Sequence, residues 1–205
     1  MNYLTIDCSN GLYVYLNVGG REFCKFDTTK KQSAELLTDI DKLLSDAKIS
    51  IRDIDVIGVN VGPGSFTGIR VAISSAKGLA IGAKAKVVTF TSFQTIENLP
   101  NNNYTILVEG FGDNIYYKVK KFGKEFLGCS NIDNIRELID GTKIYTNSLS
   151  VAEKYKNINV TLAKYNVKVV MEEKINKQDY ILTNQICPLY LRASQAEIER
   201  LKNGK

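Results

Sequence analysis

An apolar run that ends on a Gly-Pro-Gly turn constrains the fold more than any other feature of this chain. Residues 54–61 are rich in valine and isoleucine, as in a strand of a sheet that is covered on both faces. The turn Gly62-Pro63-Gly64 follows, and the apolar residues after it predict a helix that ends at about Ile81, with Gly82 at its carboxyl end. A buried strand that leads into a helix predicts an α/β fold.

The other elements follow from the alternation of apolar and polar residues and from turn residues. Before residue 27, three antiparallel strands are expected, because Ser9-Asn10-Gly11 and Gly19-Gly20 supply tight turns. Ser50 and Asp53 are spaced as a capping box that opens a short turn. Further helices are predicted over residues 31–47, 92–98, 132–139, 150–155 and 194–202, and further strands over 86–90, 105–109, 114–122, 143–146, 168–171 and 189–191.

The order of these elements predicts two related lobes. A strand meander, a helix, a strand and a helix come first, and a second, weaker round of the same elements follows. This is the order of the ribonuclease-H-like lobe, whose duplication gives the two-lobed architecture of actin and the sugar kinases. We expect a first lobe over residues 1–100, a shortened second lobe over 101–189, and a C-terminal helix over 190–205 that packs on the first lobe.

The composition excludes several kinds of chemistry. The 205 residues contain no histidine, which rules out His-dependent triads, His-containing zinc sites and the usual proton shuttle at neutral pH. The four cysteines are scattered without a C-x-x-C pair, so we expect no metal site and a reduced, cytoplasmic protein. No apolar run approaches the ~20 residues of a membrane span, and no membrane contact is expected. The net charge of +5 permits contact with nucleic acid but is common in proteins that bind none.

The loop after the buried strand is the strongest candidate for a functional motif. Two interpretations are open: it reverses the chain, with Ser65 or Thr67 capping the helix, or its amides bind an anion beside Arg70. No Gly-Lys-Ser/Thr ends the loop, so it is not a P-loop. The motif residues are Gly62, Pro63, Gly64, Ser65, Phe66, Thr67, Gly68 and Arg70.

This motif resembles the signature of the TsaB family. The nonapeptide from Gly62 to Arg70 is followed, one helix onward, by Lys77-Gly78-Leu79-Ala80, and both segments are similar to that family. The opening strand with Ile6-Asp7 and the ending Pro188-Leu189-Tyr190-Leu191-Arg192 also match. The resemblance spans the chain, is dense up to about Phe93, and is thin from Tyr104 to Cys187.

The resemblance implies a two-lobed, actin-like fold in a subunit without transferase activity of its own. In the TsaB family this subunit supports the catalytic paralogue TsaD, and the ATPase TsaE joins them. The complex moves a threonylcarbamoyl group onto N6 of adenosine 37 in tRNAs that read ANN codons. The resemblance further implies no catalytic residues and no cofactor of its own, ATP only at the interface of the complex, and tRNA contact mainly through the complex.

Two features of the sequence bear on catalysis. The paralogue is known for a pair of metal-binding histidines on its first long helix, where this chain has Lys31-Gln32-Ser33. Actin-like ATPases grip nucleotide with glycine-rich Asp turns, but Asp7 is followed by Cys8-Ser9-Asn10, without an early glycine. We therefore expect Asp7 to end a strand and cap a turn. Most relatives have Asp-x-Arg where this chain has Glu109-Gly110-Phe111.

The helix after the motif has an apolar character nearly all round. Between residues 67 and 82, Arg70 and Lys77 carry the only charges. Either the chain itself buries this helix, or the helix presents an interface, which fits the resemblance. The interface interpretation predicts a homodimer when the chain is alone, and contact with a partner through Leu36, Ile40, Leu43, Ile69, Ile73, Ala76, Leu79 and Ala80.

Other functions compete with the scaffold subunit. A free-standing actin-like ATPase or small-molecule kinase would bind and turn over ATP alone. A peptidase would need Cys8, Ser65 or Thr67 to be activated by a lysine or a carboxylate. The basic residues near the C-terminus either touch tRNA or TsaE or form a solvated helix face; they are Arg192, Arg200, Lys202 and Lys205.

Overall fold

The chain divides into two compact units, and each unit contains two separate segments of the sequence. The computed structural model describes residues 1–27, 32–96, 99–100 and 102–192. One unit comprises Met1–Thr95 and Tyr165–Pro188, and the other comprises residues 96–164 with the described residues that follow Pro188. The predicted division is therefore wrong for residues 165–188, which fold with the first unit and not with the second.

The first unit contains a five-stranded sheet. Strands β1 (Asn2–Asp7), β2 (Leu12–Val18) and β3 (Arg21–Asp27) form the predicted antiparallel meander. Strands β4 (Val56–Asn60) and β5 (Lys86–Phe90) run parallel to β1, in the order β3-β2-β1-β4-β5. Every residue of β4 is buried, as the apolar run predicts.

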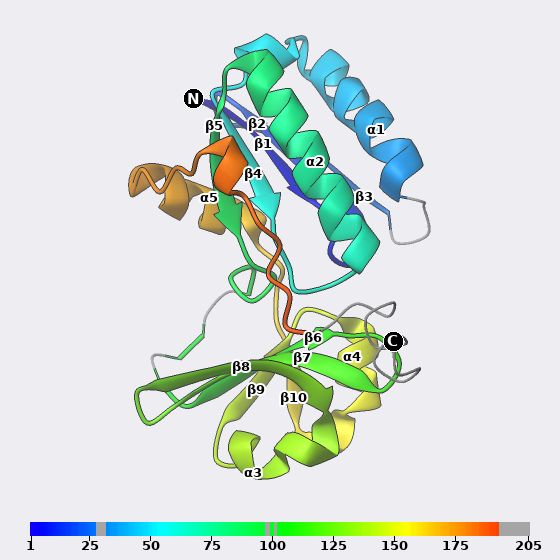
Figure 1. Cartoon of the computed structure of the whole chain (residues 1–205), viewed down its shortest axis with the longest axis vertical. Coiled ribbons are helices and arrows are strands. Elements are labelled where there is room, and N and C mark those ends of the chain that lie inside the picture. Colours follow the sequence, from blue (N-terminus) through cyan, green and yellow to red (C-terminus); the bar gives the residue numbers. More distant parts are fainter. Residues whose placement is uncertain (28–31, 97–98, 101, 193–205) are drawn as a thin grey trace, which may run out of the picture. The chain divides into compact units, whose positions relative to one another are not determined.

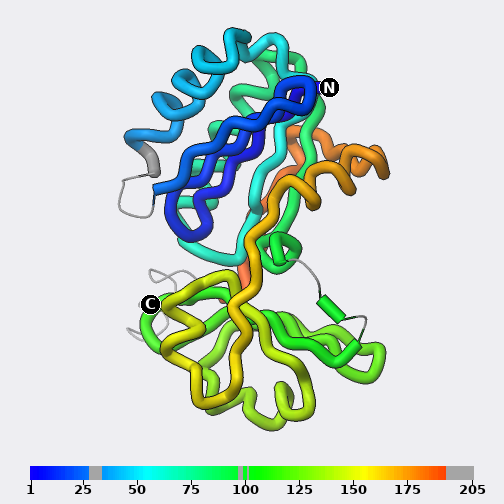
Figure 2. The backbone as a smooth tube through the Cα atoms, turned by 180° about the vertical axis from the view of Figure 1, so that it is seen from behind, coloured from blue at the N-terminus to red at the C-terminus, as the bar shows by residue number. Residues whose placement is uncertain are grey.

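Helices cover both faces of this sheet. Helices α1 (Gln32–Ala47) and α2 (Phe66–Ala83) lie side by side on one face (Figure 1). Helix α5 (Val167–Asn176) packs on the other face, where Met171 and Val170 contact the aromatic and aliphatic side chains of the strands (Figure 2). The strand predicted over residues 168–171 is therefore wrong: Asn166 caps a helix there, accepting a hydrogen bond from the Val169 amide.

Two helix boundaries test the local sequence signals. The capping box is confirmed, since the Asp53 carboxylate accepts hydrogen bonds from the amide and the hydroxyl of Ser50, at 2.7 and 2.8 Å, at the 3₁₀ turn Ile51–Asp53. At the other boundary, Lys84 and not Gly82 takes the left-handed conformation that ends α2. Gly82 lies inside the helix.

The second unit repeats the topology of the first with shorter helices. Its strands β6 (Tyr104–Glu109), β7 (Asn114–Lys121) and β8 (Lys124–Asn131) form a meander, and β9 (Lys143–Thr146) and β10 (Val160–Leu162) run parallel to β6. The order β10-β9-β6-β7-β8 is the same as that of the first sheet read from β5 to β3. Helices α3 (Arg136–Ile139) and α4 (Leu149–Lys154) have 4 and 6 residues, against 16 and 18 in α1 and α2. This confirms the α/β, actin-like and ribonuclease-H-like fold with a reduced second lobe.

Several of the remaining predicted elements are wrong or fall outside the described residues. Residues 92–95 form turns in place of the predicted helix, and residues 189–191 form no strand. Strand β8 was not predicted. The terminal helix predicted over 194–202 falls outside the described residues. Within the part of the chain that the structure describes, no helix is long and apolar enough to cross a membrane.

Candidate functional site

Asp7, at the end of β1, is the centre of a buried polar network in the first unit. Its Oδ1 accepts a hydrogen bond from the Ser9 amide at 2.8 Å. Its Oδ2 accepts one from Asn60 Nδ2 at 2.8 Å and one from the Tyr165 hydroxyl at 2.7 Å. The residue is only 5% exposed. The prediction that Asp7 ends a strand and caps a turn is confirmed.

Asn60 connects this carboxylate to the motif loop. It ends β4 and is fully buried. Its Oδ1 accepts the Gly62 amide at 2.8 Å, and its Nδ2 lies 3.0 Å from Ser92 Oγ. Ser92 Oγ in turn donates to the Pro63 carbonyl at 2.7 Å. Sequence reasoning missed Asn60, although an asparagine in an otherwise apolar strand was a signal for it.

The motif loop packs closely against the turn that follows β1. The Ser65 amide donates to the Ser9 carbonyl at 2.7 Å, and Ser65 Oγ accepts the Gly68 amide at 3.2 Å. A Cβ atom on Gly64 would lie 2.4 Å from the Ser9 carbonyl oxygen, so a larger residue does not fit there. These contacts confirm chain reversal with Ser65 as the helix cap. Anion binding by the same loop stays a prediction.

Arg70 lies one turn into α2 beside an aromatic ring of the same motif. Its guanidinium carbon lies 4.2 Å from the centroid of the Phe66 ring, which is a cation–π distance. The arginine is exposed and the phenylalanine is half-buried. The motif thus presents a positive charge held against a ring at the start of the helix.

Burial suppresses ionisation around Asp7. Burial, and then the charge of Asp7, raises the pKa of the Cys8 thiol to about 12. The pKa of Tyr165 is raised well above its ordinary value, first by burial and then by the charge and hydrogen bond of Asp7. At neutral pH both groups stay protonated, so the Cys8 thiol is not a nucleophile. This argues against the peptidase interpretation at that cysteine.

The second unit places an acidic residue at the corresponding strand end. Glu109 ends β6, and its Oε2 accepts a hydrogen bond from Ser148 Oγ at 3.0 Å. Ser148 also caps α4 through the Val151 amide. Glu109 is more exposed than Asp7. Its partner Ser148 follows β9, the strand next to β6, just as Asn60, a partner of Asp7, ends β4, the strand next to β1.

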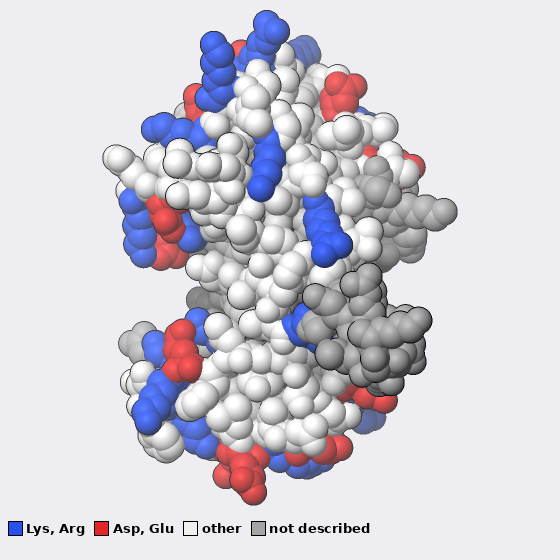
Figure 3. All heavy atoms as spheres, in the orientation of Figure 1, with Lys and Arg blue, Asp and Glu red and all other residues white. Residues whose placement is uncertain are grey.

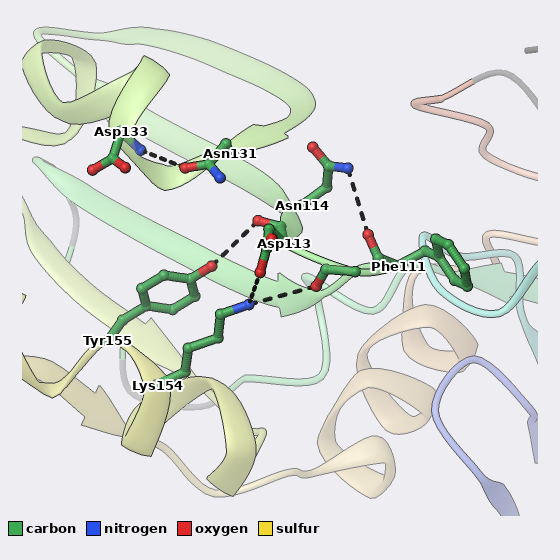
Figure 4. A network of polar contacts seen from close by, with 8 residues as sticks. Phe111, Asp113, Asn114, Asn131, Asp133, Lys154 and Tyr155 are labelled. Atoms are coloured by element: carbon green, nitrogen blue, oxygen red, sulfur yellow. Dashed lines mark hydrogen bonds and ion pairs between the residues drawn. The ribbon is translucent and has the colours of Figure 1, made fainter.

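The last residue of α4 and the residue after it form hydrogen bonds to the turn between β6 and β7 (Figure 4). Lys154 Nζ donates to Asp113 Oδ1 at 3.0 Å and lies 3.5 Å from the Gly112 carbonyl oxygen. Tyr155 Oη donates to the Asp113 carbonyl at 3.4 Å. Phe111 stays 71% exposed at this turn, and the guanidinium of Arg192 lies 5.4 Å from its ring centroid. The arginine beside this turn therefore comes from a distant part of the chain, 81 positions after Phe111.

The predicted interface residues do not form a free surface. Leu79 is half-buried, and the other seven side chains are buried between the helices and the sheet, which corrects the prediction. Their spacing at i, i+3 and i+4 places them on the face of each helix that covers its own sheet. The seven are Leu36, Ile40, Leu43, Ile69, Ile73, Ala76 and Ala80.

The outward face of the same two helices is exposed. On α2 this face carries Arg70, Ser74, Gly78 and Ile81, spaced at about one helical turn, and Ile81 is 69% exposed. Leu37 of α1 is also exposed. In the described residues, no three His, Cys, Asp or Glu side chains are grouped to hold a metal ion.

Comparison with known proteins identifies relatives in tRNA modification. A family model described as "TsaD: tRNA N6-adenosine threonylcarbamoyltransferase" matches residues 27–140. The tRNA threonylcarbamoyladenosine biosynthesis protein TsaB of Buchnera aphidicola subsp. Schizaphis graminum is 36% identical over 66 residues, which are 32% of this chain and 30% of that protein. TsaB of Escherichia coli K12 is 32% identical over 75 residues, 37% of this chain and 31% of that protein. These relatives confirm the resemblance to TsaB, and the matched stretches span less than a third of their length.

A solved structure extends the similarity over most of the chain. A protein from Pseudomonas aeruginosa, described as similar to peptidase YeaZ, superposes with a TM-score of 0.73 at 18% identity. The superposition covers 93% of this chain and 99% of that protein. At this identity the likeness establishes the fold alone.

Proposed function

Because this chain belongs to the family of TsaD, tRNA N6-adenosine threonylcarbamoyltransferase, we propose that it is a non-catalytic scaffold subunit of that modification system. It pairs with the catalytic paralogue TsaD, and the ATPase TsaE joins them. The complex transfers a threonylcarbamoyl group from its adenylate to N6 of adenosine 37 in tRNAs that read ANN codons, and AMP is the leaving group. We expect the chain to act in the cytoplasm without a cofactor of its own, with ATP bound only at the interface of the complex.

The state of Asp7 is the observation that carries this proposal. In an actin-like ATPase, the aspartate at this strand end must reach the bound nucleotide and its metal. Here both carboxylate oxygens accept hydrogen bonds from the chain itself, from Ser9, Asn60 and Tyr165. To release Asp7 for a ligand would leave buried donors without acceptors. The arrangement therefore favours a structural role for the residue that catalysis would need.

Reconstitution with the two partners tests the proposal. Threonylcarbamoyl transfer from threonylcarbamoyl adenylate to an unmodified tRNA transcript is measured with TsaD, TsaE and ATP, in the presence and absence of this chain. We expect transfer only when all three proteins are present, and none by this chain alone. Unchanged transfer without this chain, or transfer by the chain alone, would contradict the proposal.

A second measurement separates the scaffold from a free-standing enzyme. Isothermal titration of the isolated chain with ATP and Mg²⁺ is expected to give no binding heat. Binding followed by turnover would favour an actin-like ATPase or a small-molecule kinase instead.

The outward face of α1 and α2 is the surface that we assign to the partner. It combines exposed apolar side chains, Ile81 and Leu37, with small residues, Ser74 and Gly78, that permit close helix approach. The proposed interface therefore lies on the same two helices as the predicted one, but it uses their outward side chains in place of the buried ones. Without TsaD, the same face is expected to pair two copies of this chain, which light scattering detects as a dimer.

A further inference from the structure

The turn between β7 and β8 combines two locally unfavourable features. It consists of Phe122 and Gly123, with φ angles of 51° and 75°. A two-residue hairpin turn with both φ angles positive is of type I′, which favours asparagine followed by glycine. A bulky residue at positive φ is sterically disfavoured. Because the Phe122 side chain is 81% exposed, burial does not compensate this strain.

The second unfavourable feature is charge. In the register of the hairpin, Lys121 lies directly opposite Lys124, a like-charge pair that destabilises the ladder. Lys120 and Lys143 flank Tyr104 on the adjoining strands. Figure 3 shows basic side chains gathered beside acidic ones at the lower left, where Figure 1 places the end of this hairpin.

One acidic side chain lies close to the tip. Glu125 lies directly opposite Lys120 in the register and pairs with Lys118, at 3.1 Å, so it offsets the charge of that pair of lysines but not the charge of Lys121 and Lys124. The backbone carbonyl of Asp140, not its carboxylate, accepts the hydrogen bond from Lys121 Nζ at 2.6 Å. Thus the tip offers three lysines and an exposed ring within five consecutive residues, 120–124.

We propose that this tip, residues 120–124, is a contact site for an unpaired loop of RNA. The lysines neutralise backbone phosphates, and the Phe122 ring stacks on an unstacked base, which is the usual way proteins hold single-stranded RNA. Both features that destabilise the free hairpin become favourable when a polyanion with exposed bases lies on it. One exposed ring offers too little apolar area to hold a bilayer, so RNA fits the tip better than a membrane.

The inference rests on the proposed function in one respect, namely that the chain meets tRNA. It adds which part of the chain makes the contact. The contact is measurable on the isolated full chain, independently of the transfer reaction.

Substitution of Phe122 separates binding from folding. Fluorescence anisotropy with a labelled, unmodified anticodon stem-loop RNA compares the wild type with Phe122→Asn and Phe122→Tyr. Asparagine suits the turn, so Phe122→Asn is expected to raise the melting temperature while it weakens RNA binding about tenfold. Phe122→Tyr keeps a stacking ring and is expected to bind as the wild type does. Unchanged binding by Phe122→Asn would overturn the inference.

Substitution of the lysines tests the phosphate contacts. Each of Lys121→Gln and Lys124→Gln is expected to reduce the slope of log affinity against log salt by about 0.7. Lys156→Gln removes the same charge from an exposed position of the second unit and should leave the slope unchanged. An equal loss for Lys156→Gln would mean that binding is a diffuse effect of net charge, and the inference would fail.

Three further outcomes separate RNA from lipid as the occupant, and the inference from the proposed function. If the tip variants bind RNA normally but lose binding to phosphatidylcholine–phosphatidylserine vesicles, the tip contacts lipid and the inference is wrong. If the chain binds no RNA but the reconstituted complex still requires it, the inference fails and the proposed function stands. Tip-dependent RNA binding by a chain that the complex does not require would uphold the inference and refute the proposed function.

Discussion

Asn60 joins groups that are distant in the sequence. Its side chain contacts Asp7, Ser92 and the Gly62 amide, and it is fully buried. Asn60→Ala removes one hydrogen bond each from Asp7 and Ser92 and the Asn60 acceptor of the Gly62 amide in a closed site, so the free energy of unfolding should fall by about 2–4 kcal/mol. Urea denaturation measures the loss. Asn157→Ala, at an exposed position, is the matched control and should change stability by less than about 0.5 kcal/mol.

Cys8 gives a prediction for the dependence of stability on pH. Its thiol pKa is raised from 9.0 to about 12 by burial and by Asp7, so the folded state favours the neutral thiol. The contribution of this thiol to the free energy of unfolding is fully present below pH 9. Between pH 9 and about 12 the thiol ionises in the unfolded state but not in the folded state, so the free energy of unfolding falls by about 1.4 kcal/mol per pH unit. The difference in unfolding free energy between the wild type and Cys8→Ala isolates it from the tyrosines. A difference that does not change with pH across this range would contradict the assignment.

At single residues, the sequence predicted only those roles that depend on near neighbours in the chain. Asp7 as a turn cap and Ser65 as a helix cap follow from neighbours two or three positions away. The partner Tyr165 lies 158 positions from Asp7. No local pattern indicates such a contact, because only the packing of α5 on the sheet brings the tyrosine to the carboxylate.

Helix α2 distinguishes the core face from the partner face. Ile73 is 6% exposed and Ile81 is 69% exposed, eight positions apart on the same helix. Ile73→Asp buries an unpaired charge and should unfold the first unit, with a loss of about 3–5 kcal/mol. Ile81→Asp should leave the melting temperature within a few degrees of the wild type but abolish pairing with TsaD or with a second copy. Size-exclusion chromatography with light scattering checks both variants, and normal pairing by a folded Ile81→Asp protein would refute the outward face.

The elements that could be predicted are those with a strong local period. The β1–β3 meander, α1 and α2 combine clear turns with apolar stripes. Strand β8 was missed because it is an edge strand with Lys124 and Glu125 at its start, and its first four residues are all exposed. Helix α5 was mistaken for a strand because its buried residues, Val167, Val170 and Met171, fall in a short valine-rich run. A short apolar run does not distinguish a strand from a buried helix.

At the scale of the whole molecule, the chain leaves the first unit after residue 95 and returns at residue 165. The predicted boundaries follow the order of the sequence and could not show this return, because the segment 165–188 carries no signal of where it packs. One close contact of this segment with the first sheet is at Gly58 of β4, where an added Cβ atom would lie 2.1 Å from Met171 Sδ. A glycine in a buried strand therefore makes room for a flexible side chain of α5.

This contact makes the division of the chain testable by a double-mutant cycle. Gly58→Ala forces Met171 aside and should cost about 1–3 kcal/mol, and Met171→Ala should cost about 2–5 kcal/mol through the cavity that it leaves. In the double variant the new methyl group occupies part of that cavity, so the combined loss should be smaller than the sum by at least about 0.5 kcal/mol. Met171→Ala combined with Ile144→Ala, from the core of the second unit, provides the additive control. Additive losses for Gly58 and Met171 would mean that α5 does not pack on the first sheet in solution.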